Sequence, residues 1–482
     1  ICAMPEPGKK TIEVLTVANG LPDEIVYTLQ TDRKGDIWIG TYDHGICRYQ
    51  VREHKLDYPG KPWTVGPVTS LAIFGDREVW AGTQQHGLIR LETGADSDRP
   101  ASIFSLPDTH FLRREHIVAL RKDREGLLWA VTNKGAIYAA NVRIGLLATP
   151  FQEVQAICVD RYSRLWAGSP EGLFIRKKDA FQPVLPGTEN IVSLWESPDG
   201  RIWVGTFGNG VFVLNPDGKI LRRLTEKDGL TNGSVLSISG NTTRVWLATL
   251  GGVTEVDLNT YQIKTYQQEL GAGYIYKVLA DSKGRIWFGT DGSGLILLDQ
   301  GRFQHIRQAA GRTLKTVYSI AEDMQGNIWF STDKDGLYRF DGASFRRYGL
   351  EEHLHSLNIS GLAVDGNGYL VIAYDDGVDV LTPATGHVLF LDGASGAPTV
   401  QSSLNAICID KNGNLWLGAR SGILRMAAFR EPFVYDPEPN ITAVSVFLQP
   451  FNFWETSRFD HDQNYFLFHF TGLWYTNPEL VR

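Results

Sequence analysis

The sequence is poor in cysteine and methionine and has no long apolar run, and each absence excludes a class of protein. Four cysteines among 482 residues are too few for a disulfide-dense scaffold. No stretch of 18 apolar residues occurs, so no segment predicts a membrane-spanning helix. The net charge is −7 with acidic and basic residues interspersed, which argues against a face that binds nucleic acid.

The first ten residues, ICAMPEPGKK, show no targeting signal. They have neither a charged start nor a long apolar stretch, and Ile1 before Cys2 does not suit a lipid-anchor site. We interpret this end as a mature or trimmed N-terminus. Cys158 in AICVD and Cys408 in AICID occupy the same position of two repeats, and we expect them to be free, buried and part of the core.

Tryptophan and glycine are abundant, with 13 and 50 residues, and both recur at a regular period. Ten units of 37 to 49 residues share one central position, which is tryptophan in nine of them. The ten central residues are Trp38, Trp80, Trp129, Trp166, Trp203, Trp246, Trp287, Trp329, Val371 and Trp416. A glycine follows each of them after six or seven residues. Such a period is typical of solenoids and propellers.

Each unit predicts a small antiparallel sheet. The pattern Asp-x-x-Gly-x-x-Trp, complete for example at Asp281, Gly284 and Trp287, indicates a tight turn between two strands. A third apolar strand follows the later glycine, and a weaker fourth strand often comes next. We therefore predict an all-β fold, a β-propeller of four-stranded antiparallel blades, in which each tryptophan lies between neighbouring blades.

The closure of the ring is open to several interpretations. The N-terminal segment TIEVLTV resembles a fourth strand, and the last repeat, ending in GILRMA, lacks one. We expect TIEVLTV to complete the last blade, with about ten repeats over residues 11–430 in one large ring. A ring of seven to nine blades with extra repeats, or two smaller rings, remains open.

The residue four positions before the turn aspartate is usually small. Thr28, Ala119, Ala156, Ser319, Gly361 and Ala406 stand there. Small side chains suit an innermost strand that is crowded around an axis. Lys277 is the exception to this pattern.

The repeats stop near residue 430, and residues 431–482 differ in character. A proline-rich linker leads into NYFLFHFTGLWYTNPELVR, which predicts the N-terminal part of a β-sandwich domain. We expect the natural protein to continue beyond Arg482.

The units GLPDEIVYTLQTDRKGDIWIGTYDHGICRY and LKTVYSIAEDMQGNIWFSTDKDGLYRFDG resemble two-component regulator propeller repeats. The resemblance covers about residues 11 to 428, and the tail NYFLFHFTGLWYTNPE is similar to the start of the three-tyrosine (Y_Y_Y) domain that follows such propellers. It implies a periplasmic sensor of a bacterial membrane receptor whose histidine kinase or diguanylate cyclase module is absent from these residues. Some relatives sense oligosaccharides, and the best described carry fourteen repeats in two seven-bladed rings.

The loops between second and third strands share a rim with the loops that enter the inner strands, and they vary while the framework is constant. A rigid scaffold with variable loops is suited to binding, so we expect a small molecule or oligosaccharide to bind at this rim. The candidate residues are Tyr42, Asp43, His44, His86, Phe207, Asn209, Asp291, Asp333, Asp375, Asp376 and Arg420. Ordinary solvated turns are the alternative for each of them.

No catalytic motif, cofactor or metal site is predicted. The carboxylates of Asp375 and Asp376 are adjacent in a turn, which does not make a catalytic pair. The Asp-Lys-Asp-Gly sequence at 333–336 lacks the further oxygen ligands of a calcium loop. The resemblance implies a homodimer in the full receptor. A propeller enzyme similar to streptogramin lyase and a protein-interaction scaffold remain alternatives.

Overall fold

The structure is a computed structural model of the 482-residue chain. It describes residues 2–3, 13–58, 66–74, 78–92, 102–105, 111–123, 127–140, 144–177, 180–186, 190–271, 273–391, 401–428, 440–447, 449–451 and 464–471. The chain forms two compact units, one of residues 143–436 and one of residues 1–142 with 437–482.

The unit of residues 143–436 is a ring of seven four-stranded antiparallel sheets, here called ring blades 1 to 7. Ring blade 1 is β15 (Ala156–Val159), β16 (Leu165–Ser169), β17 (Gly172–Lys177) and β18 (Ala180–Pro186). Ring blade 2 is β19 (Ile191–Glu196), β20 (Ile202–Thr206), β21 (Val211–Leu214) and β22 (Ile220–Leu224). Ring blade 3 is β23 (Val235–Gly240), β24 (Arg244–Thr249), β25 (Gly252–Asp257) and β26 (Ile263–Tyr266).

The remaining blades repeat the same order of strands. Ring blade 4 is β27 (Ile275–Ala280), β28 (Ile286–Thr290), β29 (Leu295–Asp299) and β30 (Arg302–Ile306). Ring blade 5 is β33 (Val317–Glu322), β34 (Ile328–Thr332), β35 (Leu337–Phe340) and β36 (Phe345–Tyr348). Ring blade 6 is β37 (Gly361–Val364), β38 (Leu370–Ala373), β39 (Val378–Leu381) and β40 (Val388–Leu391). Ring blade 7 is β41 (Ser402–Ile409), β42 (Leu415–Ala419), β43 (Gly422–Met426) and β14 (Ile144–Leu147).

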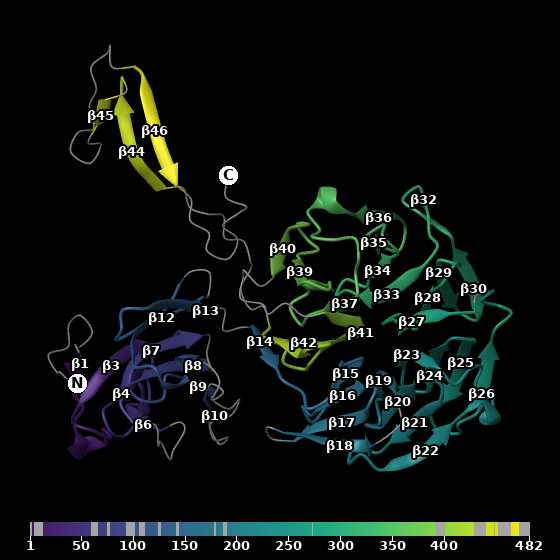
Figure 1. Cartoon of the computed structure of the whole chain (residues 1–482), viewed down its shortest axis with the longest axis horizontal. Helices are drawn as coiled ribbons and strands as arrows, with labels where there is room; N and C mark the ends of the chain where they lie inside the picture. Colours follow the sequence, from purple (N-terminus) through teal and green to yellow (C-terminus); the bar gives the residue numbers. More distant parts are fainter. Residues whose placement is uncertain are drawn as a thin grey trace. The chain divides into compact units, whose positions relative to one another are not determined.

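The seven inner strands surround a common axis, and the fourth strands lie at the periphery (Figure 1). Each inner strand contacts the inner strand of the next blade, and β41 of the last blade contacts β15 of the first. Trp203 of ring blade 2 packs into one core with Val235 and Val245 of ring blade 3. At the closing seam Trp416 packs in the same way with Ile157 and Leu165. The expected role of the tryptophan between neighbouring blades is therefore confirmed.

The expected ring of ten blades is wrong, because the chain closes a circle of seven. The fourth strand of the last blade is β14, which pairs with β43 from Ile144 opposite Met426 to Leu147 opposite Ile423. The expected closing segment TIEVLTV does not take that place: its part in β2 (Glu13–Val14) pairs with β1 (Cys2–Ala3), and residues 11–12 lie outside the described residues. Strand β14, which follows the third repeat in sequence, is thus the fourth strand of the tenth repeat.

A carboxylate holds the indole of most blades. In the turn between the first two strands, Asp281 Oδ1 accepts hydrogen bonds from the backbone N–H groups of Lys283 and Arg285. Its Oδ2 accepts from Trp287 Nε1 at 2.9 Å. The same indole–carboxylate bond joins Trp38 to Asp32, Trp129 to Asp123, Trp166 to Asp160, Trp329 to Asp323 and Trp416 to Asp410. This bond explains the six-residue spacing between the aspartate and the tryptophan.

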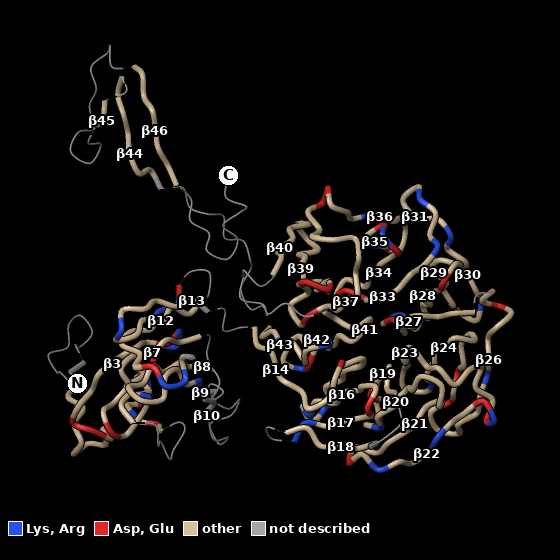
Figure 2. Tube along the Cα trace, in the orientation of Figure 1, with Lys and Arg blue, Asp and Glu red and all other residues tan. Residues whose placement is uncertain are grey.

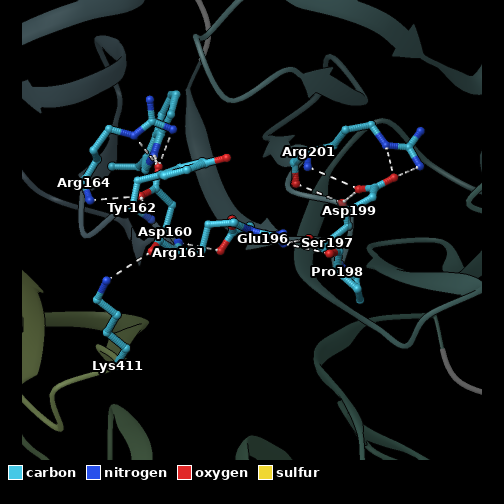
Figure 3. A network of polar contacts seen from close by, with 11 residues as sticks. Asp160, Arg161, Tyr162, Arg164, Glu196, Ser197, Pro198, Asp199, Arg201 and Lys411 are labelled. Carbon is cyan, nitrogen blue, oxygen red and sulfur yellow. Dashed lines mark hydrogen bonds and ion pairs between the residues drawn. The ribbon is translucent and has the colours of Figure 1, made fainter.

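Polar contacts between these turns also join the blades (Figure 3). Arg161 of ring blade 1 donates from Nε to Glu196 at 2.6 Å and from Nη2 to the carbonyl oxygen of Ser197 in ring blade 2. Across the closing seam, Lys411 Nζ donates to the carbonyl oxygen of Arg161 at 3.3 Å, although the two residues are 250 positions apart. Polar contacts between the turns that join first and second strands thus bridge the closing seam, in addition to the core contacts of Trp416.

The other unit contains three blades. Their strands are β3 (Val26–Thr31), β4 (Ile37–Thr41), β5 (Ile46–Gln50) and β6 (Lys55–Asp57); β7 (Val68–Phe74), β8 (Glu78–Thr83), β9 (Leu88–Glu92) and β10 (Ser102–Ser105); and β11 (Ile117–Lys122), β12 (Leu128–Thr132) and β13 (Ile137–Ala140). The first strands β3, β7 and β11 contact one another in that order. Tyr27 and Leu29 on β3 are about half exposed.

A separate three-stranded sheet has the order β45 (Gln449–Phe451), β44 (Asn440–Val446), β46 (Phe466–Thr471). The linker expected from residue 431, up to 439, and the end of the chain from 472 lie outside the described residues. The smaller elements are β31 (Gln308–Ala309), β32 (Arg312–Thr313) and the 3₁₀ turns η1 (Val17–Asn19), η2 (Phe111–Arg114), η3 (Glu226–Asp228) and η4 (Leu350–Glu352). The all-β propeller class is thus confirmed, while the β-sandwich assignment stays a prediction.

Replacing Asp281 by asparagine tests the clamp on the indole. Asparagine has only one acceptor oxygen, so either Trp287 Nε1 or the backbone N–H groups of Lys283 and Arg285 lose their partner, and we expect the free energy of unfolding to fall by about 2 kcal/mol. Asp299→Asn, which changes an exposed carboxylate at the end of β29 in the same blade, is the control and should leave stability unchanged. Urea denaturation measures both; equal midpoints for the two variants would contradict the clamp.

Candidate functional site

Four inner strands of the ring, β19, β23, β27 and β33, have an irregularity in their pairing near one rim. The register shifts by one residue between Ile191 and Ser193, and the same shift recurs in β23, β27 and β33. The extra residues are Val192, Leu236, Tyr276 and Tyr318. A β-bulge re-aims the side chain of its extra residue. In three of these blades the re-aimed residue lines the cavity described next.

A cavity of about 610 Å³ lies at this rim of the ring. Two groups of residues line it: those where the chain enters the inner strands, including the first residues of these strands, and those in the loops between second and third strands. The first group contributes Glu153, Gln155, Asn190, Val192, Leu236, Tyr276 and residues 401–405, and the second contributes Phe207, Leu250, Asp375 and Arg420. The volume falls within the range of sites that hold small organic ligands.

Four buried polar atoms that line the cavity have no partner among the described residues. They are Gln155 Oε1, Asn190 Oδ1, Ser403 Oγ and Asn405 Oδ1. Each buried polar atom without a partner costs about 1–3 kcal/mol. Three of the four are carbonyl oxygens, which only accept hydrogen bonds. The wall of the cavity therefore offers acceptors to ligand groups that donate hydrogen bonds.

Two lining residues have backbone conformations that are unusual for residues with a side chain. Glu153 has φ 43° and Asn405 has φ 59°. Asn405 is held there by two bonds, since its N–H donates to the carbonyl oxygen of Ser360 and its Nδ2 donates to the carbonyl oxygen of Tyr318. These bonds tie ring blade 7 to ring blades 6 and 5. Left-handed conformations at residues other than glycine persist where the surroundings fix them, often at functional sites.

Aromatic side chains give the cavity apolar surface and hydroxyl donors. Tyr276, in the lining, and Tyr318 have ring centroids 5.1 Å apart. Burial raises the pKa of both phenols, and the carboxylate of Asp291 acts in the same direction. Both hydroxyls therefore stay protonated at neutral pH. Phe207 is 52% exposed at the mouth, where its ring is available for stacking.

The loops of the rim are fixed from within. Thr206 Oγ1 donates to the carbonyl oxygen of Gly210 at 2.8 Å and accepts from the N–H of Asn209. Thr290 and Thr332 make the same bond to Gly294 and Gly336. This hydroxyl bond accounts for the threonine and the later glycine of the repeat, and it gives the variable residues a rigid base.

The structure brings three of the predicted site residues together at the cavity: Phe207, Asp375 and Arg420. The other four predicted residues of the ring have different roles. Asp291 accepts from Thr316 Oγ1 at 2.9 Å, and Asp376 pairs with His355 Nε2 at 3.0 Å. Asn209 caps the Thr206 turn, and Asp333 is exposed in the β34–β35 loop.

The remaining four predicted residues belong to the three-blade unit and do not line this cavity. Tyr42 packs edge-to-face on Tyr27, with ring centroids 5.8 Å apart. The N–H of Asp43 donates to Asp23 Oδ2 at 2.6 Å, and His44 Nδ1 lies 3.6 Å from the same carboxylate. His86 donates its N–H to Thr83 Oγ1. These contacts are those of well-ordered turns.

Sequence reasoning missed the residues of the inner-strand entries, namely Glu153, Gln155, Asn190, Tyr276 and Asn405. The signal was available, because Gln155, Tyr276 and Asn405 all stand five positions before the turn aspartate of their repeat. For Tyr276 and Asn405 that position lies within the irregular pairing of the inner strand, which does not show in the alternation of apolar residues.

No cluster of three or more His, Cys, Asp or Glu side chains suited to a metal ion occurs in the described part of the chain. Cys158 and Cys408 are free thiols that pack against blade cores, as expected, but both are partly rather than fully buried. Burial raises the pKa of the Cys158 thiol to about 12, so it is not a nucleophile at neutral pH. Within the described residues, no helix has the length and apolarity needed to cross a bilayer.

Three segments match the family model described as two component regulator propeller: residues 20–43, 269–292 and 312–334. Two of these segments lie in the closed ring, over the first two strands of ring blades 4 and 5, and one lies in the three-blade unit, over β3 and β4. Each contains or adjoins a loop between second and third strands. No curated protein matches the chain. The propeller part of the expected resemblance is therefore supported.

The fold is similar to that of two extracellular domains from B. thetaiotaomicron. The extracellular domain of the putative hybrid two component system BT3049 has 18% identity and a TM-score of 0.59, and the match covers 97% of this chain and 66% of that one. For the extracellular domain of BT4673 the values are 15%, 0.51, 98% and 75%. The chain thus spans just under two thirds of the BT3049 domain. At these identities the likeness establishes a shared fold.

A catalytically inactive virginiamycin B lyase from Staphylococcus aureus is also similar, with 12% identity and a TM-score of 0.50. That match covers 59% of this chain and 99% of the lyase. It extends over a share of the chain close to that of a single ring, whereas the two extracellular domains match almost all of it.

Replacing Asn190 by alanine tests whether its buried carbonyl oxygen is uncompensated. The variant removes an atom that has no partner, so we expect the free energy of unfolding to stay the same or rise by up to about 1 kcal/mol. Asn327→Ala is the matched control, because Asn327 Nδ2 donates to Asp323 Oδ2 at 2.8 Å in the core. The control should lose about 1–2 kcal/mol. An equal loss in both variants, measured by urea denaturation, would contradict this description of the cavity.

Proposed function

We propose that this chain is the periplasmic ligand-sensing domain of a bacterial two-component signalling receptor. A small molecule or oligosaccharide binds in the rim cavity of the closed ring, and the signal passes through a following Y_Y_Y domain to a kinase or cyclase module. The observation that carries the proposal is the 610 Å³ cavity with its uncompensated buried acceptors on a rigid rim. The match to two-component regulator propeller repeats supports the signalling context.

An oligosaccharide fits the chemistry of the lining. Sugar hydroxyls donate hydrogen bonds, and the lining offers the acceptors of Gln155, Asn190 and Asn405. The rings of Tyr276 and Phe207 provide flat surfaces against which the apolar face of a pyranose packs. The Arg420 guanidinium adds donors at the mouth.

Signalling requires that the ligand distinguish two states of the receptor. A ligand shifts an equilibrium only by the difference between its affinities for the two states. The cavity is lined by residues from several ring blades, so a bound ligand favours one relative placement of those blades. In the proposed homodimer the blades transmit this difference to the membrane through segments beyond this chain.

The enzyme alternative finds less support at the site. Asp375 lines the cavity, but its neighbour Asp376 is paired with His355, so the two carboxylates do not act together on one substrate. The imidazole of His355 is itself stacked on Phe390, with ring centroids 3.5 Å apart. A protein-interaction scaffold needs no cavity of this kind. Figure 2 shows acidic and basic positions interspersed over the ring, which supports no nucleic-acid partner.

Binding of neutral and acidic oligosaccharides to the chain, followed by thermal shift, tests the proposal. A ligand at 100 times its dissociation constant adds about 2.7 kcal/mol of stability. We expect Tyr276→Ala to weaken binding at least about tenfold, because it removes a stacking surface and a hydroxyl donor. Tyr162→Ala is the control, since Tyr162 is an exposed tyrosine in a turn of Figure 3, outside the lining.

The proposal fails if no oligosaccharide in a broad panel stabilises the chain, or if a bound one is equally weakened by both tyrosine variants. Release of a cleaved sugar during the assay would favour the enzyme alternative.

A further inference from the structure

Lys277 is the exception in a circle of small residues. In the seven ring blades the equivalent position of the inner strand is occupied by Ala156, Ser193, Ser237, Lys277, Ser319, Gly361 and Ala406. The pairing is equivalent too: Lys277 is opposite Gly289 of β28, as Ser193 is opposite Gly205 of β20. Six of the seven side chains at this position have at most two heavy atoms, which indicates that there is little room between blades at this level of the ring.

The space between blades at this level is already filled. A Cβ added to Gly289 would lie 2.7 Å from the carbonyl oxygen of Val317 in the next blade. In ring blade 3 the equivalent Ser237 Oγ accepts a hydrogen bond from the N–H of Val278 on β27. A four-carbon side chain exceeds the room that the six small residues indicate at this level, and the inner strands that carry this position surround the axis of the ring (Figure 1). Lys277 is accordingly neither fully buried nor exposed.

The ammonium group of Lys277 has no anionic partner. No hydrogen bond or ion pair joins it to any other residue that the structure describes. Burial alone lowers its pKa to about 8. An unpaired charge that is held away from water is costly, and such charges in proteins are paired or bind a counter-ion.

The strands packed against β27 supply no compensating charge. β23 and β28 carry no titratable side chain. On β24, Arg244 pairs with Glu255 at 2.7 Å. On β33, Glu322 accepts from the N–H of Ser282, and the other titratable group is the phenol of Tyr318. On β27 itself the neighbour is Tyr276, which lines the cavity directly before Lys277.

We propose that Lys277 binds an acidic group of the ligand, so that the compound recognised in the rim cavity is an anionic sugar, a uronic-acid-containing oligosaccharide. This inference rests on the proposed sensing function and adds the chemical class of the ligand. The sugar ring lies among the acceptors and tyrosines of the cavity, and its carboxylate reaches toward the axis, where it pairs with the ammonium group. A carboxylate in this position gains a charge-assisted bond in surroundings of low dielectric constant.

The test compares uronic-acid-containing oligosaccharides with neutral ones of the same length on the whole chain. At pH 6.5 the acidic compounds should bind, and Lys277→Met and Lys277→Gln should weaken them at least about tenfold. Lys283→Met, an exposed lysine in the following turn, is the matched control and should change nothing. Affinity should also fall as the pH rises through about 8, where the ammonium group loses its proton.

A second readout needs no ligand. The pKa of Lys277 is lower in the folded chain than its ordinary value of 10.5, so the folded state binds fewer protons between about pH 8 and pH 10.5. Stability rises with pH in that window, and below it the unpaired charge is destabilising in full. Lys277→Met should therefore melt at a higher temperature than the unmodified chain at pH 7, by a margin that disappears near pH 10.5.

The outcomes separate the two proposals. If neutral oligosaccharides bind and Lys277→Met leaves their affinity unchanged while acidic compounds do not bind, the sensing function stands and the acidic ligand class is overturned. If acidic compounds bind equally well to both Lys277 variants, the role of Lys277 is overturned. If nothing in the panel binds, the sensing function fails and this inference fails with it.

Discussion

The hydrogen bond from the tryptophan indole to the turn aspartate is the interaction on which the blades depend. It fixes a large apolar ring against the neighbouring sheet and leaves no unpaired donor in the core, as with Trp287 and Asp281. Where the aspartate is missing, the cost is visible: Trp203 Nε1 and Trp246 Nε1 have no partner among the described residues. Those two repeats have serine at 197 and glycine at 240, six positions before the tryptophan.

Because the ring is rigid, its rim can hold groups that lower the stability of the fold. Left-handed backbone at Asn405, buried carbonyl oxygens without partners and an isolated ammonium group all occur around one end of the axis. Each lowers stability, and each is a feature that a bound ligand can compensate. The opposite turns show the reverse, because Arg161, Glu196 and Lys411 are satisfied by one another and by backbone carbonyl oxygens (Figure 3).

Much of the fold can be predicted from the sequence, because each repeat contains the residues that specify its turns and strands. The position of the tryptophan between blades, the four-stranded blade and the free thiols of Cys158 and Cys408 are all local features. The number of blades in the ring is not local. It depends on which of two similar strands, TIEVLTV or Ile144–Leu147, pairs with β43, and this is decided by the geometry of the whole circle. The site was predicted in part for a related reason: loop polarity marks Phe207, Asp375 and Arg420, whereas the bulge that aims Tyr276 is a property of strand pairing.

The most direct test of the account is a disulfide across the closing seam of the ring. Gly145 and Arg425 are directly opposite each other in the β14–β43 pair, so cysteines at these two positions should form a disulfide on oxidation and raise the melting temperature. The competing pair combines a cysteine at Arg425 with one at Val14, in the segment once expected to close a larger ring. We predict cross-linking of 145 with 425 and none of 14 with 425. The opposite result would show that the seven-bladed ring, and the cavity built on it, do not exist in solution.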